Sequence, residues 1–116
     1  KVFEVFEKYK TSIDMITTSE VAVSVTIDSD LFLDDIVREL EPFGTVDVDK
    51  GQTIVSIVGN EIAQTDHVLQ KLFDALNEVP VTMVSYGGSA HNISLLVPQD
   101  YKTKTLQLLN AGLFGL

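Results

Sequence analysis

One succession of apolar patterns occurs twice in this chain, and this repetition is the strongest constraint on its fold. Apolar residues recur at helical spacing in some segments and alternate with polar residues in others, which predicts helices and strands respectively. The first half is predicted to hold a helix, two strands, a helix and a strand, at residues 1–10, 13–17, 21–27, 31–40 and 45–49. The second half is predicted to hold a strand, a helix, two strands and a helix, at residues 53–58, 62–76, 81–85, 93–97 and 98–109.

Each half corresponds to a βαββαβ unit that lacks one strand, the opening strand in the first half and the closing strand in the second. The two halves also share a short local similarity, because Ile13-Asp-Met-Ile parallels Val81-Thr-Met-Val. A split βαβ (ferredoxin-like) unit places its strands in one antiparallel sheet with two helices on one face. We therefore predict an α+β fold with two tandem units, at residues 1–51 and 52–116.

Composition excludes several classes of function. The 116 residues are enough for one ordinary domain or two very small ones, and 8 basic against 17 acidic side chains give a net charge of −9. This acidity argues against binding to nucleic acid or to an anionic membrane surface, and no apolar run approaches the ~18 residues of a transmembrane helix. The absence of Cys excludes disulfides and thiolate metal sites, and it fits a reducing cytosol.

The stretch from Ser12 to Glu20 departs from these ordinary patterns. It places an acid, Asp14, inside an otherwise apolar strand, and it ends with three hydroxyl residues and a second acid, Glu20. A half-buried carboxylate is costly unless a cation or several donors meet it. Asp14 is therefore either a solvent-facing strand residue or a ligand for a cationic group.

Other polar residues are expected to be structural. The pair Asp34-Asp35, together with Asp47 and Asp49, is interpreted as solvated surface. His67 is expected at an exposed helical position and His91 in a hydrogen-bonded turn, and their separation gives no metal-site signal.

Three segments resemble one family in the correct order. Ser12-Ile-Asp-Met-Ile-Thr-Thr-Ser-Glu-Val resembles the first ACT unit of aspartate kinases (aspartokinases) of the lysine-sensitive type. Ile57-Val-Gly-Asn60 and Ser89-Ala-His-Asn-Ile-Ser94 resemble parts of their second ACT unit. The resemblance covers essentially the whole chain.

The resemblance implies a regulatory region that binds an amino-acid effector, most simply lysine, with threonine as the other possibility. It assigns the effector contacts to Ser12, Ile13, Asp14, Ser19 and Glu20. Thr82 stands where the first unit has Asp14, so the second site is expected to be degenerate and to have a packing role. The resemblance also implies a homodimer through the ACT units and a cytoplasmic protein.

The same resemblance implies that both missing strands and a kinase domain lie upstream of Lys1, and that ATP and Mg²⁺ belong to that domain. We expect no cofactor and no catalysis in this segment, because Gly87-Gly88 is too short for a phosphate-binding loop and lies between strands.

Other functions remain open at this point. The parent protein is either a monofunctional aspartate kinase or a threonine-sensitive enzyme fused to homoserine dehydrogenase, and an ACT module of another amino-acid enzyme is a further alternative. A ferredoxin-like enzyme of the acylphosphatase type would need an Arg on a phosphate-binding loop, whereas Arg38, the only Arg, is predicted inside a helix. An RNA-binding sheet would need aromatic and basic residues on its central strands, and the predicted strands lack them.

Overall fold

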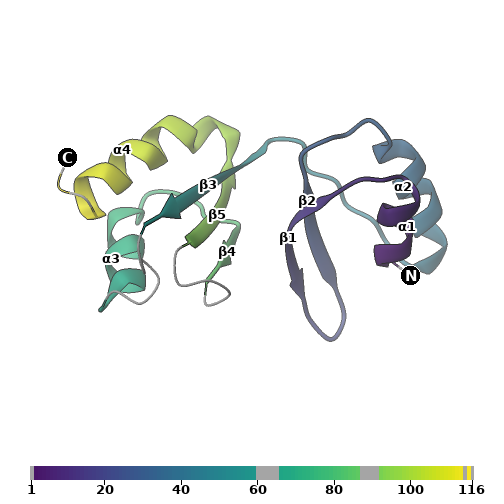
Figure 1. Ribbon diagram of the computed structural model, residues 1–116, viewed down its shortest axis with the longest axis horizontal. Coiled ribbons are helices and arrows are strands. Elements are labelled where there is room, and N and C mark those ends of the chain that lie inside the picture. The colour runs from purple at the N-terminus through teal and green to yellow at the C-terminus, as the bar shows by residue number, and fades with distance from the viewer. Residues whose placement is uncertain (1, 60–65, 87–91, 114, 116) are drawn as a thin grey trace. The chain divides into compact units, whose positions relative to one another are not determined.

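The computed structural model describes residues 2–59, 66–86, 92–113 and 115, and the chain divides into two compact units, Lys1–Val48 and Asp49–Leu116. Figure 1 shows the course of the chain through both units. The predicted division after residue 51 lies close to this boundary. Each unit combines helices with an antiparallel sheet, so the predicted α+β class is confirmed.

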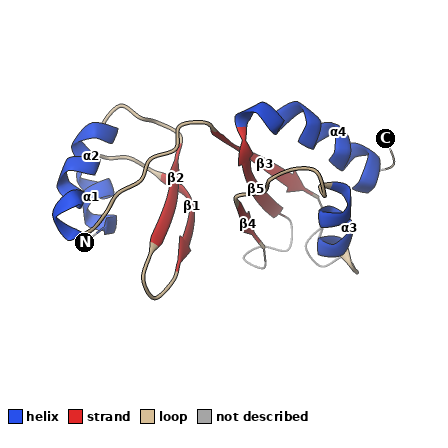
Figure 2. Cartoon of the chain, turned by 180° about the vertical axis from the view of Figure 1, so that it is seen from behind, coloured by secondary structure: helices blue, strands red, loops and turns tan. Residues whose placement is uncertain are grey.

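The first unit is a β-hairpin with two helices on one side (Figure 2). Its elements are α1 (Val2–Lys8), β1 (Ile13–Thr18), β2 (Val23–Ile27), α2 (Leu33–Leu40) and the 3₁₀ helix η1 (Glu41–Phe43). The strands pair antiparallel. The core of the unit consists of Val5, Phe6 and Ile36, with partly buried apolar residues of both strands packed against them. The apolar stripes of the two helices thus meet one face of the hairpin, as the periodicity predicts.

The end of α1 is set by a left-handed residue. Lys10 has φ of 52°, and its N–H donates to the carbonyl of Glu7 at 3.0 Å. The N–H of Thr11 donates to the carbonyl of Phe6 at 2.9 Å. This pair of hydrogen bonds is the Schellman motif, which satisfies carbonyls at a helix C-terminus.

Two sequence predictions in the first unit are wrong. The sequence Asp28-Ser-Asp30 is typical of a turn and of a helix N-cap, and it predicts a cap for the second helix, but α2 has Phe32 at its N-cap position, with no side-chain cap hydrogen bond. The segment 45–49 was predicted as a strand, yet it is not assigned to any strand, and Val48 is 48% exposed. Its alternation of Val with Asp is that of a strand, but a strand also needs a hydrogen-bonded neighbour, and the described residues offer none to this segment.

The second unit is a three-stranded sheet with two helices. Its elements are β3 (Gln52–Val58), α3 (Val68–Ala75), β4 (Met83–Ser85), β5 (Asn92–Pro98), the 3₁₀ helix η3 (Gln99–Tyr101) and α4 (Lys102–Leu113). The strand order is β3-β5-β4, and both pairs are antiparallel. The core combines residues of the sheet, of the helices and of the segment after α3, namely Val55, Ile57, Val68, Leu72, Leu76, Val79, Ile93, Leu95, Val97 and Leu109. The strand β5 contributes most to this core because it is the central strand.

The helices of the second unit differ from the sequence prediction at two places. The predicted helix from residue 62 is described only from Val68, and residues 60–65 lie outside the described part. His67 is exposed, as expected, but it precedes α3 in the left-handed conformation, with φ of 58°. The helix α4 continues past the predicted end at residue 109 to Leu113, which packs against the core. Phe114 and Leu116 lie outside the described residues.

Candidate functional site

The predicted effector residues all lie on the β1–β2 hairpin. Ser12 precedes β1, Ile13 is its first residue, and Asp14 is its second. Ser19 and Glu20 follow β1 in the hairpin turn. Ile13 packs against the core of the first unit, whereas the other four side chains are exposed. The structure therefore places these four polar side chains where a ligand or partner can reach them.

Asp14 lies at an irregularity in the hairpin. Ile13 pairs with Ile27 and Met15 pairs with Thr26, so that the register shifts between Ile13 and Met15. The N–H of Met15 donates to the hydroxyl Oγ1 of Thr26 at 2.9 Å. A bulge of this kind changes the direction in which a strand side chain points. The Asp14 side chain is exposed to solvent, while its neighbours Ile13 and Met15 are fixed by core packing and by the hydrogen bond to Thr26. The half-buried carboxylate considered from the sequence is therefore not found.

Ser19 stabilises the hairpin turn through hydrogen bonds to Ala22. Its N–H donates to the carbonyl of Ala22 at 2.8 Å. Its hydroxyl accepts from the N–H of Ala22 at 3.2 Å and lies 3.4 Å from the Ala22 carbonyl, to which it donates. The turn therefore begins β2 at Val23 rather than at Val21, and it presents Glu20 and Val21 at its tip.

The two acids are not brought together within one chain. Asp14 lies near the start of β1 and Glu20 lies beyond its end. At about 3.3 Å per strand residue, the four steps from Asp14 to Thr18 alone span ~13 Å. A single lysine molecule is too short to bridge both carboxylates in one copy of this unit.

The corresponding position in the second unit has a different environment. The N–H of Thr82 donates to the carbonyl of Leu96 at 2.7 Å, and its hydroxyl donates to Oε1 of Gln52 at 3.1 Å. This side chain is neutral and already hydrogen-bonded to its own unit. Since a neutral hydroxyl gives an ammonium group no ion pair, this arrangement is consistent with a packing role.

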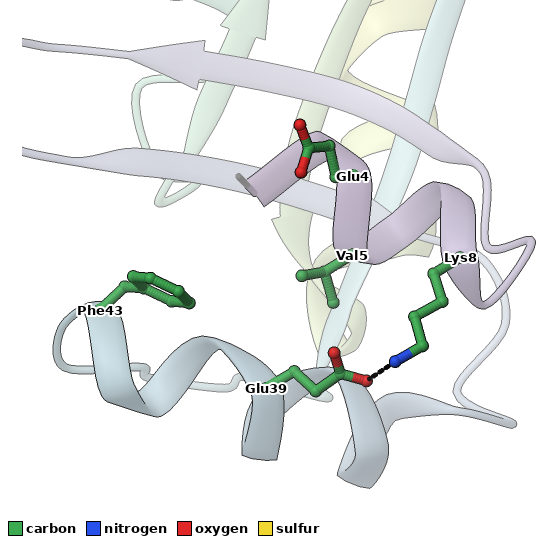
Figure 3. A pocket seen from close by; sticks show the side chains of 5 residues that line it. All are labelled: Glu4, Val5, Lys8, Glu39 and Phe43. Atoms are coloured by element: carbon green, nitrogen blue, oxygen red, sulfur yellow. Dashed lines mark hydrogen bonds and ion pairs between the residues drawn. The ribbon is translucent and has the colours of Figure 1, made fainter.

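One concave feature of the first unit was not predicted. A groove of about 220 Å³ between α1 and α2 is lined by Glu4, Val5, Lys8, Glu39 and Phe43 (Figure 3). The Nζ atom of Lys8 lies 2.9 Å from Oε2 of Glu39, and the hydroxyl of Tyr9 donates to the same oxygen. The sequence gives no signal for this cluster, because its members come together only when the two helices pack.

The hydrogen bonds in this groove affect the ionisation of their members. The hydrogen bond from Tyr9, followed by that from Lys8, lowers the pKa of Glu39. The hydrogen bond to Glu39 raises the pKa of Tyr9 and of Lys8. The Glu39 carboxylate is therefore held as an anion with two donors on one of its oxygens.

The described part of the chain offers no sign of a metal centre. No group of three or more His, Asp or Glu side chains that could hold a metal ion occurs among the described residues. The described helices also include none that is long and apolar enough to cross a membrane. His91 lies outside the described residues.

Comparison with known proteins decides the family. Residues 55–113 match the family model described as ACT domain. The chain belongs to the ACT domain family. The ferredoxin-like fold predicted for the two units is that of this family, and the chain is an ACT regulatory region of the aspartokinase type, because its curated and structural relatives are aspartokinases.

Three relatives illustrate this membership of the ACT family. A C-terminal regulatory domain of aspartate kinase from Porphyromonas gingivalis W83 is 47% identical with a TM-score of 0.87, over 98% of this chain and 78% of that one. The lysine-sensitive aspartokinase 3 of Escherichia coli is 31% identical over 98% of this chain and 27% of its own length. The structure of E. coli aspartokinase III in complex with lysine and aspartate (T-state) has a TM-score of 0.82 and 33% identity, over 97% of this chain and 26% of that one.

The ACT region is short beside its curated relatives. The chain spans about a quarter of the length of the aspartokinases that it matches.

Proposed function

We propose that this ACT region senses lysine and transmits feedback inhibition to an ATP-dependent aspartate kinase, at the first step of the biosynthesis of the aspartate-derived amino acids. The observation that carries the proposal is the exposed Asp14 carboxylate, which the bulge of β1 fixes at an edge strand of the hairpin. Two relatives support the proposal, namely the lysine-sensitive aspartokinase 3 of E. coli and the structure of E. coli aspartokinase III in complex with lysine and aspartate.

The chemistry of the hairpin fits a dicationic amino acid. The Asp14 carboxylate suits one ammonium group of lysine, and the hydroxyl of Ser12 adds an exposed hydrogen-bonding group beside it. Glu20 suits a second ammonium group. Because Asp14 and Glu20 lie at opposite ends of β1, the two acids would meet one ligand only if they came from different copies of the chain.

A dimer of ACT units therefore forms part of the proposal. Among the described strands β1 pairs with β2 alone, so no described strand covers its outer edge, which is available for pairing. Antiparallel pairing of two β1 strands would place the start of one strand beside the end of the other, and Asp14 of one copy beside Glu20 of its partner. A ligand bound there would favour one arrangement of the two copies, which is the requirement for allosteric control.

The test is calorimetric titration of lysine and threonine into the complete gene product and into the 116-residue chain. We expect saturable binding of lysine, and at least a tenfold loss of affinity in Asp14→Asn because a charge-assisted hydrogen bond is removed. Thr82→Val is the matched control in the second unit and should leave the affinity unchanged. The absence of binding by either amino acid in the complete protein would overturn the sensor function.

Threonine is the second candidate effector, and the same titration decides between the two amino acids. Threonine has a single ammonium group, so its binding would need only one of the two acids. A preference for threonine, with Glu20→Gln having no effect, would favour the threonine-sensitive alternative.

A further inference from the structure

The connector between α1 and β1 leads directly into the proposed effector residues. It runs from Tyr9 to Ser12, and Asp14 follows two residues later as the second residue of β1. The side chains of Ser12 and Asp14 are both exposed. Because exposed side chains gain little from packing, their positions depend on how firmly the backbone around them is held.

The connector is fixed to α1 by hydrogen bonds of its own backbone. The Schellman pair at Lys10 and Thr11 closes the end of the helix. The hydroxyl of Thr11 donates to the carbonyl of Tyr9 at 3.2 Å, and Thr11 is only 9% exposed. These contacts hold the connector to the helix that precedes it.

The side chain of Tyr9 ties the same connector to α2. Its hydroxyl donates to Oε2 of Glu39, and its ring centroid lies 5.8 Å from that of Phe32, at the N-cap position of α2. This separation is within the ~4.5–7 Å of aromatic pairs. Phe32 and Glu39 are seven positions apart, about two helical turns, so both lie on one side of α2. Tyr9 is half-buried and also packs against the core of the first unit.

Two donors reach the Glu39 carboxylate, and they differ in environment. The Nζ atom of Lys8 lies 2.9 Å from Oε2, as Figure 3 shows, but the Lys8 side chain is 61% exposed. Exposed ion pairs contribute little to stability. A hydrogen bond from a half-buried hydroxyl to a carboxylate is one of the stronger kinds. We therefore expect Tyr9, rather than Lys8, to determine how firmly the connector is held against α2.

We propose that Tyr9 is a positioning residue for the effector site. Its hydrogen bond to Glu39 anchors the connector to α2, and the anchored backbone holds Ser12 and Asp14 in the place where they meet the amino acid. Tyr9 acts through the backbone and not through contact with the effector. This inference rests on the effector site proposed above.

The first measurement is hydrogen exchange of backbone amides, followed by NMR in the 116-residue chain labelled with ¹⁵N. Tyr9→Phe removes only the hydroxyl, and it should speed exchange at Lys10 and Thr11 by roughly threefold to tenfold, since local opening no longer breaks the bond to Glu39. Tyr101→Phe is the matched control in the second unit and should leave both rates unchanged. Unchanged rates in Tyr9→Phe would overturn the anchoring.

The second measurement is calorimetric titration of lysine into the complete gene product. Tyr9→Phe and Glu39→Leu should each weaken lysine binding by roughly threefold to fivefold. The double variant should bind no more weakly than either single one, because both substitutions remove the same hydrogen bond. Glu39→Gln keeps an oxygen that can accept from Tyr9, so it should recover part of the affinity. Lys8→Met removes only the exposed ion pair and should change the affinity by less than about twofold.

Ile36→Val separates positioning from a general loss of stability. Ile36 is a buried core residue of the same unit, and the loss of one methyl group destabilises the unit but leaves the Tyr9–Glu39 bond in place. This variant should bind lysine like the parent protein. Equal losses of affinity in Ile36→Val and Tyr9→Phe, or additive losses in the double variant, would overturn the positioning role.

The titration also distinguishes failure of this proposal from failure of the sensor function. If the complete protein binds lysine and Tyr9→Phe binds it equally well, only the positioning role of Tyr9 is wrong. If the complete protein binds neither lysine nor threonine, the sensor function is wrong, and the positioning role is wrong with it.

Discussion

Gly112 on α4 lies against Ala75, the last residue of α3, so closely that a Cβ atom on Gly112 would be 2.6 Å from the Ala75 Cβ. Real Cβ atoms do not approach one another to this distance, so these two helices can cross here only because position 112 has no side chain. The crossing closes the helix layer over the core of the second unit.

Gly112→Ala is therefore expected to destabilise the second unit, although Ala is the better helix former. The loss should be about 1–3 kcal/mol of unfolding free energy, the range typical of overpacking, measured by urea denaturation. Gly44→Ala is the matched control, since a Cβ there would meet nothing within 4 Å. Ala75→Gly should recover part of the loss when combined with Gly112→Ala, and strictly additive effects would contradict the contact.

Lys10→Gly is expected to stabilise the first unit. Lys10 occupies the left-handed position of the Schellman motif after α1, where a residue with a Cβ costs ~1–2 kcal/mol relative to Gly. The unfolding free energy should rise by about 1 kcal/mol, less than the full strain because Gly also makes the unfolded chain more flexible. Lys50→Gly, whose position has no positive φ, should not stabilise the protein. Equal effects of the two substitutions would argue against the motif.

Thr105 tests the cost of a buried hydroxyl. This residue of α4 is 0% exposed, and its Oγ1 has no hydrogen-bond partner among the described residues. Thr105→Val removes the unsatisfied group at nearly constant shape and should raise the unfolding free energy by about 1 kcal/mol. Thr105→Ser keeps the hydroxyl but loses a methyl group, so it should lower the stability by about 1 kcal/mol. Stabilisation by both substitutions would contradict this explanation.

Thr26 is expected to position Asp14. Its hydroxyl accepts the N–H of Met15 beside the bulge, and Thr26→Val leaves that N–H without a partner. Calorimetry should then show a loss of lysine affinity of about fivefold, since a lost hydrogen bond costs about 1 kcal/mol. Thr26→Ser restores the acceptor and should restore the affinity. If both variants bind lysine like the parent chain, the bulge does not determine the site.

The cluster of Lys8, Tyr9 and Glu39 predicts a specific pH dependence. The pKa of Glu39 is lowered in the folded state, mainly by the hydrogen bond from Tyr9, so its stabilising effect is complete above the ordinary value of 4.5 and is lost as the pH falls further. Thermal unfolding of Glu39→Gln should therefore depend less on pH between about 5 and 3 than that of the parent chain.

The same cluster also predicts a loss of folding stability at alkaline pH. The hydrogen bond to Glu39 raises the pKa of both Tyr9 and Lys8, so their contributions are present below about pH 10 and are lost as the pH rises. Glu39→Gln should also weaken this alkaline dependence. Glu7→Gln, on the exposed face of α1, is the control, and it should lose stability at acidic and at alkaline pH as the unsubstituted chain does.

The sequence predicted the order of elements because each element has a local pattern. The apolar stripe of α2 and the alternation in β3 can both be recognised without a partner. The strand predicted at 45–49 fails for the opposite reason, because local alternation does not provide the neighbour to which a strand must hydrogen-bond. The turn at Ser19 similarly shortens β2, since its hydroxyl takes up both polar groups of Ala22.

The candidate site was predictable in its members but not in its geometry. The exposed placement of Asp14 depends on a register shift involving Thr26, twelve positions away along the chain. The groove at Glu39 depends on the packing of α1 against α2, and the Lys8–Glu39 pair is separated by 31 positions. Such contacts have no signature in the spacing of residues along the sequence.

The unpaired segment 45–49 has a consequence for the behaviour of the protein in solution. This strand-like stretch contains two valines, Val46 half-buried and Val48 exposed, and no described strand pairs with it. Such a stretch is a template on which other chains can grow into aggregates. Asp47 and Asp49 alternate with these valines, so two stacked copies would bring like charges into register. We therefore expect the same acidity that argues against nucleic acid as a partner to oppose association of chains through this segment.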